Sequence, residues 1–158
     1  MFLKYVYVFF ISMVPVIELR GAIPVGIGLG LPVIPTYVVA VIGNMIPVPF
    51  IYFFLQKLLK FGMSLRWQPV SRFCTWIYQK GVNGGKKLQG KSGIAIFWAL
   101  LIFIGIPLPG TGAWTGTLAA SILNIDFKKS VLAAMGGVLL AGIIMGAASM
   151  GVFSMIFR

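Results

Sequence analysis

The sequence contains no histidine, one cysteine and only two acidic residues in 158. Without histidine the usual ligand sets for zinc and haem cannot form, and neither a Ser-His-Asp nor a Cys-His catalytic arrangement is possible. The single cysteine, Cys74, excludes a disulfide within the chain. We therefore expect a protein that is not an enzyme and that uses no metal and no cofactor.

Acidic charge is scarce because thirteen bases face two acids, which leaves a formal net charge of +11. Excess positive charge can indicate nucleic-acid binding, but in such proteins the bases cover a water-exposed fold. Here they interrupt apolar runs, and 59% of the residues are hydrophobic, which is more than a soluble domain of this size can bury. The sequence thus predicts an all-α, polytopic membrane protein that does not bind nucleic acid.

One of the two acids stands beside a base in an apolar stretch, Pro15-Val16-Ile17-Glu18-Leu19-Arg20-Gly21-Ala22-Ile23-Pro24. An ionisable group at the centre of a membrane helix costs about 2.5–3.5 kcal/mol, so one that persists usually faces a partner, a cavity or a transport path. Arg20 is the expected partner, and the prolines and Gly21 predict a break in the helix. Two roles are open: Glu18 and Arg20 couple transport to protons, or they cap a polar turn at the membrane surface.

Two short apolar limbs flank this break. Residues 2–17 reach about 24 Å as a helix, less than the roughly 30 Å of a bilayer core, and residues 25–31 are shorter still. This predicts a re-entrant hairpin over about 2–31, followed by a transmembrane helix over about 37–59 that is kinked at its prolines. Asn44 in that helix either lines the same polar cavity as Glu18 or bonds to a neighbouring helix. No small-x-small cleavage site follows the N-terminal limb, so we expect it to be retained.

The next segment, residues 57–91, holds eight of the thirteen bases and no acid. Positive charge concentrates on the cytoplasmic side of membrane proteins, so this is predicted to be a cytoplasmic connection. Within the connecting unit 61–91, apolar spacing predicts an amphipathic helix over about 69–80, ended by Gly81 and the Asn83-Gly84-Gly85 run. This helix either lies on the membrane or the bundle, or recognises anionic lipid headgroups.

A second apolar limb breaks at Pro107-Leu108-Pro109-Gly110-Thr111-Gly112-Ala113-Trp114. The limbs on either side are again too short to span the bilayer, which predicts a second re-entrant hairpin over about 94–123. Asp126 is expected to cap the final transmembrane helix, over about 131–155. Small residues at Gly137, Gly142 and Gly146 favour tight helix packing, against either the same chain or another copy.

The two halves, residues 1–60 and 92–158, show the same series of hairpin and span, displaced by roughly ninety residues. Each half crosses the membrane once in net terms, so the second must be inverted and both termini must lie outside the cell membrane. Inverted repeats with broken helices are typical of secondary transporters, and backbone N–H groups at such ends attract anions. We expect Glu18 and Arg20 to act in proton coupling, and the substrate cavity to include Pro24, Asn44, Pro107, Pro109, Gly110, Thr111, Gly112 and Trp114.

The Glu18–Pro24 and Pro107–Trp114 motifs, together with Gly43-Asn44 and the two prolines that follow, resemble the bacterial and archaeal small multidrug export protein family. That family is distantly similar to the DedA (VTT-domain) superfamily. For this chain, the resemblance implies two facing re-entrant hairpins, an essential acid at Glu18, and proton-dependent movement of lipids such as undecaprenyl phosphate. In the DedA pattern arginines bracket the second Pro-Gly, whereas Ile106 and Gly112 stand there in this chain. Arg20 would have to supply that charge.

Taken together, these features predict a small proton-coupled transporter of an amphipathic or lipid-like substrate, for example a polyprenyl phosphate. Efflux of small hydrophobic drugs is the alternative within the same class. A non-transporting membrane scaffold is the alternative from another class. The expected partners of the predicted transporter are membrane lipids, protons, the substrate and a second copy of the chain in a homodimer.

Overall fold

The computed structural model describes residues 1–15, 17–88, 90–91, 93–108 and 110–156, and over these the chain is helical, without a β-strand. The predicted all-α class is therefore confirmed. The elements are α1 (Phe2–Met13), α2 (Glu18–Gly28), α3 (Val33–Met45), α4 (Pro47–Phe50), the π-helical stretch η1 (Ile51–Leu55), α5 (Gln56–Ser64), α6 (Gln68–Leu88), α7 (Gly93–Gly105), α8 (Ala113–Ile122) and α9 (Phe127–Ile156).

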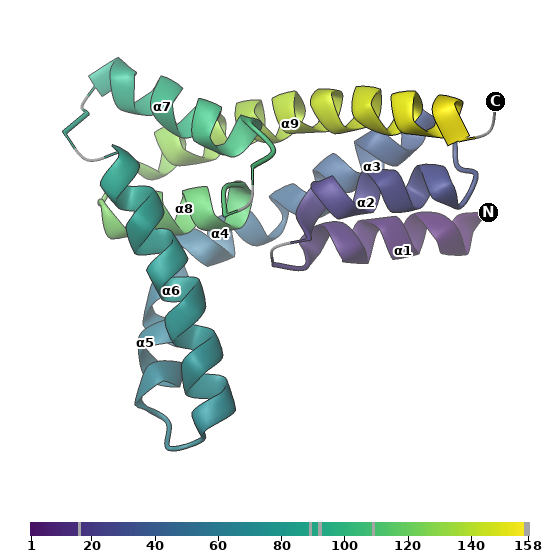
Figure 1. Cartoon of the computed structure of the whole chain (residues 1–158). Helices are drawn as coiled ribbons and strands as arrows, with labels where there is room; N and C mark the ends of the chain where they lie inside the picture. The colour runs from purple at the N-terminus through teal and green to yellow at the C-terminus, as the bar shows by residue number, and fades with distance from the viewer. Residues whose placement is uncertain (16, 89, 92, 109, 157–158) are drawn as a thin grey trace.

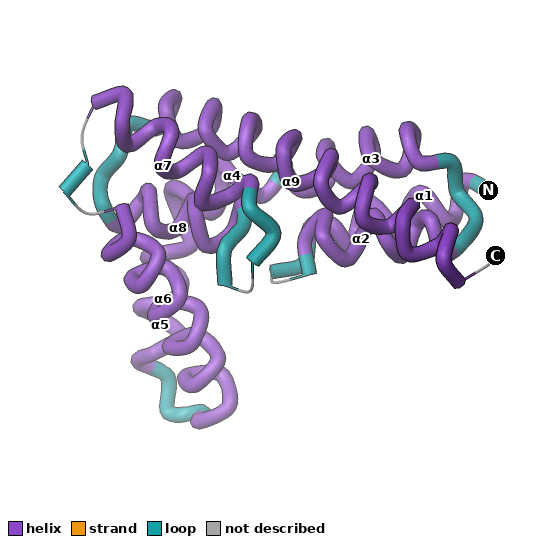
Figure 2. Tube along the Cα trace, turned by 45° about the horizontal axis from the view of Figure 1, so that its top comes forward, coloured by secondary structure: helices purple, strands orange, loops and turns teal. Residues whose placement is uncertain are grey.

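Two helical hairpins form the ends of an elongated bundle. Figure 1 shows α1 and α2 on the right and α7 and α8 on the left, with the turn of each hairpin directed toward the other. Helices α3 and α9 run along them, and α9 contacts both α2 and α7. Helices α5 and α6 form a third hairpin that projects away from the bundle in both views (Figures 1 and 2).

Among the described residues, two stretches are long and apolar enough to cross a membrane, Val33–Ser64 and Phe127–Val152. Many large apolar side chains are exposed on the outside of the bundle, for example Ile34 (77% exposed) and Ile143 (62% exposed). Such surfaces are unfavourable in water and ordinary against lipid. The inside is a core shared by both hairpins and by the two helices α3 and α9, which we call the long helices. This core includes buried Val8, Ile23 and Ile104.

The predicted position of the first helix break is wrong. Helix α2 continues through Gly21 and Pro24, so the first break lies before Glu18, where Val14 is extended. The ring of Pro24 fits the helical backbone and removes a single hydrogen bond, and a membrane helix tolerates that loss when its neighbours surround it. The kink expected in the span over about 37–59 is present, because α4, which holds Pro47 and Pro49, and η1 join α3 to an α5 that extends crosswise to it (Figures 1 and 2).

Helix α6 is longer than the predicted 69–80 segment and does not end at its glycines. Gly81, Gly84 and Gly85 are buried within it. A Cβ atom at Gly84 would lie 3.1 Å from the ring of Phe103, and one at Gly81 would lie 2.5 Å from the side chain of Leu118. These glycines therefore allow α6 to approach α7 and α8 closely, and this packing outweighs their low helix propensity.

The turns that precede the two long helices share a hydrogen-bond pattern at an offset of 94 residues. The backbone N–H groups of Leu29, Gly30 and Leu31 donate to the carbonyls of Val25, Ile27 and Gly26. Those of Leu123, Asn124 and Ile125 donate to the carbonyls of Ala119, Ser121 and Ala120. At the same offset, the Thr36 and Ser130 hydroxyls donate to the carbonyl four residues earlier, at 2.7 and 2.9 Å.

Glycines allow α3 and α9 to pack closely against the first helix of the neighbouring hairpin, which is α1 for α3 and α7 for α9. A Cβ at Gly43 would lie 2.6 Å from the carbonyl oxygen of Phe9, and one at Gly137 would lie 2.8 Å from that of Leu101. A Cβ at Gly142 would overlap the ring of Tyr37, whereas the nearest atom to one at Gly146 is 3.9 Å away on Val33. Gly137 and Gly142 thus pack within the chain. Asp126 caps α9 as predicted, since its carboxylate accepts the N–H of Lys129 at 3.1 Å.

These contacts predict different costs for two similar substitutions in α9. Gly137→Ala would push against the backbone of α7 and should lower the free energy of unfolding by about 1–3 kcal/mol. Gly146→Ala meets only ordinary contact and should leave stability unchanged or raise it by up to about 1 kcal/mol. Thermal unfolding of both variants in the same detergent measures the difference. Equal melting temperatures would contradict the packing described.

Candidate functional site

The carboxylate of Glu18 binds the start of α8. Its Oε2 accepts the N–H of Ala113 at 3.1 Å and its Oε1 accepts the N–H of Trp114 at 3.0 Å. The side chain is 3% exposed, so this contact lies inside the protein. The first N–H groups of a helix have no partner within the helix and carry a partial positive charge. The acid of the first hairpin therefore caps the broken helix of the second.

The guanidinium of Arg20 binds the end of α7 and the loop that follows it. Nη1 donates to the carbonyl of Leu108 at 2.6 Å, and Nη2 donates to the Thr111 hydroxyl at 2.9 Å. Nη2 also lies 3.4 and 3.3 Å from the carbonyls of Ile104 and Ile106. The last carbonyls of a helix carry a partial negative charge, which a cation stabilises. Glu18 and Arg20 thus cap the two facing helix ends of one hairpin, and we call this arrangement the double cap.

The expected direct pairing of Glu18 with Arg20 is not formed. Among the described residues no nitrogen–oxygen contact within 4.0 Å joins them. Each charge instead meets backbone groups of the opposite hairpin, more than 80 residues away in sequence. The double cap therefore holds the two hairpins together and leaves neither charge without hydrogen bonds inside an apolar bundle.

Gly112 makes room for the carboxylate. Its φ of +124° is one that residues with a side chain rarely adopt, and a Cβ there would lie 2.8 Å from Oε1 of Glu18. Gly110 also has positive φ, +83°, but no atom lies within 4 Å of the Cβ position. The two glycines of the Gly-Thr-Gly loop therefore have different roles.

Substitution of these glycines should separate strain from loss of the cap. Gly110→Ala should destabilise the protein by about 1–2 kcal/mol through its backbone conformation alone. Gly112→Ala should cost about 1–3 kcal/mol more, because displacement of the carboxylate leaves buried N–H groups without acceptors. Denaturation in detergent, followed by tryptophan fluorescence, compares the two. Equal losses would show that Glu18 does not depend on Gly112.

The guanidinium of Arg20 should not be replaceable by another cation. Arg20→Lys keeps the charge but loses the fork that reaches several oxygens at once, and should lower the unfolding free energy by about 1–3 kcal/mol. Lys4→Gln, which removes one exposed hydrogen bond to Leu29, serves as a control and should change it by less than about 0.5 kcal/mol. Melting temperatures in detergent measure both. A lysine at position 20 with full stability would argue against the cap at α7.

A cavity of about 380 Å³ lies beside the double cap. It is lined by Glu18, Arg20, Lys80, Pro107, Leu108, Gly110, Thr111, Thr115 and Met145. A second cavity, of about 280 Å³, shares Leu108 and Thr111 with the first and extends over α7. Its lining combines Lys87 and Lys91 with the apolar residues Leu88, Ala99, Ile102, Phe103 and Ile106.

Of the eight residues predicted for the cavity, three line it and two more contact the Glu18 carboxylate. Pro107, Gly110 and Thr111 line it with Glu18 and Arg20. Gly112 and Trp114 contact the Glu18 carboxylate without lining the same cavity. The sequence did not single out Lys80, Thr115 and Met145, which are placed there by long-range packing.

Three of the residues predicted for this cavity are not among those that line it: two lie elsewhere in the structure, and one lies outside the described residues. Pro24 lines a separate cavity of about 200 Å³ next to α9. Asn44 is fully buried in α3, and neither its amide nitrogen nor its oxygen has a hydrogen-bond partner among the described residues. Its proposed interhelical bond is therefore not observed. Pro109 lies outside the described residues.

The fold and the site define the class of protein, which is a small helical membrane protein whose two broken-helix hairpins meet at buried charges. The model of the family described as "Putative small multi-drug export protein" matches residues 18–144. The chain belongs to this family, and the matched region begins at Glu18 and contains both sides of the double cap. The family's name describes export rather than catalysis. Comparison with curated proteins and with solved structures finds no match.

Proposed function

We propose that the protein is a proton-coupled transporter of an amphipathic or lipid-like substrate, such as a polyprenyl phosphate. One observation carries this proposal: the buried Glu18 carboxylate holds the start of α8 beside a cavity of about 380 Å³. A buried acid at the meeting point of two broken helices is an arrangement that transporters use to bind ions and substrates.

The proposed architecture is an inverted repeat of a re-entrant hairpin and a span. Helices α2 and α8 have 11 and 10 residues, so they reach about 15–17 Å and are too short to cross a bilayer. The matching turns at an offset of 94 residues and the hairpins that meet end to end support this arrangement (Figure 1). In a membrane, the unpaired groups at each break must find partners within the protein, and the double cap supplies them at the second hairpin.

The proposed proton coupling rests on the chemistry of the cap. As a carboxylate, Glu18 offers an acceptor oxygen to each of the two N–H groups. Protonation at one oxygen removes the charge that the helix end attracts and converts that oxygen to a hydroxyl, which weakens the contact with α8. The charged groups that face Glu18 across the cavity are Arg20 and Lys80. Loss of the contact would let the hairpins separate and would leave the N–H groups free for an anionic substrate group.

The cavity lining favours a substrate with an anionic group and an apolar chain. Arg20 and Lys80 outnumber Glu18, whose charge is already engaged by α8, and Thr111 and Thr115 add hydroxyl donors. The adjoining cavity over α7 offers an apolar surface flanked by two lysines. The same cavities are less suited to a cationic drug, although export of small drugs is the activity that the family's name describes.

The proposed orientation puts the connection 57–91 in the cytoplasm and both termini outside the cell membrane. The end of α6 and the start of α9 lie at the same end of the bundle, so Lys86, Lys87, Lys128 and Lys129 gather there, as the positive-inside rule expects (Figure 1). A homodimer remains part of the proposal, because one copy has little surface with which to close a polar path.

Transport in proteoliposomes tests this function. A fluorescent polyprenyl phosphate and a cationic dye are followed in parallel, with and without an imposed pH gradient. We expect movement of the polyprenyl phosphate that depends on the gradient, and a loss of at least about tenfold in Glu18→Gln. The control is Asp126→Asn. This change removes the chain's other acid, which caps α9, and should keep gradient-dependent transport.

The outcomes separate the alternatives. Movement of the dye alone would establish drug efflux in place of lipid transport. Movement without dependence on the gradient or on Glu18 would refute proton coupling. If neither compound moves while the protein remains folded, both substrate proposals fail and a non-transporting scaffold becomes the leading function.

A further inference from the structure

The α5–α6 hairpin lies crosswise to the helices that can span a membrane. Figures 1 and 2 show α3 and α9 along the bundle and α5 and α6 extending away from its side. When α3 and α9 cross a bilayer, a hairpin in this direction runs along the plane of the membrane. Its surface is therefore the part of the chain best placed to contact lipid headgroups.

An unpartnered apolar stripe runs along α5 and its end. Phe54, Leu58, Phe61 and Leu65 follow at intervals of four, three and four residues, so they share one side of the helix, and each is 42–65% exposed. The inner side of the same helix, with Leu59 and Gly62, is buried against α6, where Gly62 approaches Cys74. The stripe is thus left over after the hairpin has packed.

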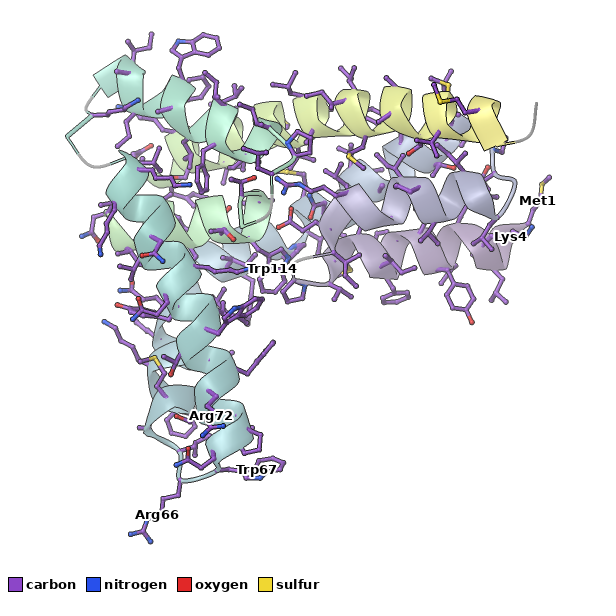
Figure 3. All side chains as sticks on the ribbon, in the orientation of Figure 1. Met1, Lys4, Arg66, Trp67, Arg72 and Trp114 are labelled. Atoms are coloured by element: carbon purple, nitrogen blue, oxygen red, sulfur yellow. The ribbon has the colours of Figure 1, made fainter. Side chains whose placement is uncertain are left out.

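Positive charge accompanies the stripe. Lys57 and Lys60 are exposed on α5, one residue before Leu58 and Phe61. At the tip of the hairpin Arg66 and Trp67 extend outward (Figure 3), Trp67 is 70% exposed, and Arg72 is exposed near the start of α6. No acid occurs between residues 57 and 91. Tryptophan is enriched at membrane interfaces, and bases beside apolar residues are typical of helices that lie on anionic membranes.

We propose that the α5–α6 hairpin docks on the bilayer surface and binds anionic phospholipid headgroups. The α5 stripe enters the acyl-chain boundary, and Lys57, Lys60, Arg66 and Arg72 lie at the level of the phosphates. A second copy of the chain is a poorer occupant, because it would bring the same bases to the same face and lysine is depleted in protein interfaces. This contact is independent of transport, since it uses no residue of the double cap.

Spin-label accessibility of the full chain in nanodiscs tests the docking. In a Cys74→Ser background, single cysteines replace Leu58 and Phe61 on the stripe, Lys57 and Lys60 beside it, and Ile143 on α9 as a lipid-facing control. We expect labels at 58 and 61 to be reached by oxygen, as at 143, and labels at 57 and 60 to be reached severalfold more by a water-soluble nickel chelate. High nickel accessibility at 58 and 61 would place the hairpin in water and overturn the proposal.

Lipid charge provides the second arm. The labels at 58 and 61 are compared in zwitterionic discs and in discs that contain phosphatidylglycerol, with and without Lys57→Gln, Lys60→Gln, Arg66→Gln and Arg72→Gln. Each base near an anionic surface strengthens binding by about fivefold, so the variant in anionic discs should behave as the parent does in zwitterionic discs. No effect of lipid charge would refute headgroup binding. Labels at 58 and 61 that neither reagent reaches would show a protein contact instead of a lipid one.

Since the labelled variants could lose their fold, a measurement on the chain with its natural cysteine accompanies them. Fluorescence of Trp67 is isolated as the difference between the wild type and Trp67→Phe, and is quenched by lipids brominated near the headgroup or deep in the chain. Shallow quenching that exceeds deep quenching supports an interfacial tip. Absence of quenching by either lipid overturns the docking without bearing on whether Glu18 couples transport to protons.

Discussion

The structure depends on how a helix can be broken inside an apolar environment. Each break leaves backbone N–H groups or carbonyls without partners in their own helix, and each such group is costly when it is buried unpaired. At the second hairpin these groups are matched by two side chains of the first, Glu18 at the start of α8 and Arg20 at the end of α7. The same two contacts therefore complete one hairpin and join it to the other, so neither hairpin is independent of its neighbour.

Close approach between helices makes this geometry possible. The carbonyls of Phe9 and Leu101 lie against Gly43 and Gly137, which lets each long helix rest on the backbone of its hairpin. Close van der Waals packing stabilises these contacts, as expected in a membrane, where apolar side chains are as favourable against lipid as against protein. The glycines of α6 extend the rule to the connecting segment, because they bring α6 against α8 and thereby carry Lys80 to the cavity.

The sequence is informative about single elements and less so about what they meet. Limb lengths, the cap at Asp126 and the isolation of Glu18 in apolar sequence could all be recognised from local pattern. The acceptor role of Glu18 toward Ala113 could not, because it joins residues 95 positions apart and involves a backbone group that no residue type signals. Glycines and Pro24 misled for a related reason. Their local propensities indicate breaks, whereas tertiary packing decides whether the helix continues.

The contact between Glu18 and Gly112 also explains why the proposed repeat is not symmetric in its residues. At the offset of 94, Gly112 is the counterpart of Glu18, and the carboxylate lies against the place where a side chain of Gly112 would begin. Equivalent residues of two repeats can touch only near the axis that relates the repeats. Two carboxylates there would repel and would compete for the same space. One acid and one glycine avoid this conflict, so the frame can be nearly symmetric while its charged centre comes from one half. A single acid then serves both hairpins, and in the proposed mechanism its protonation would affect them together.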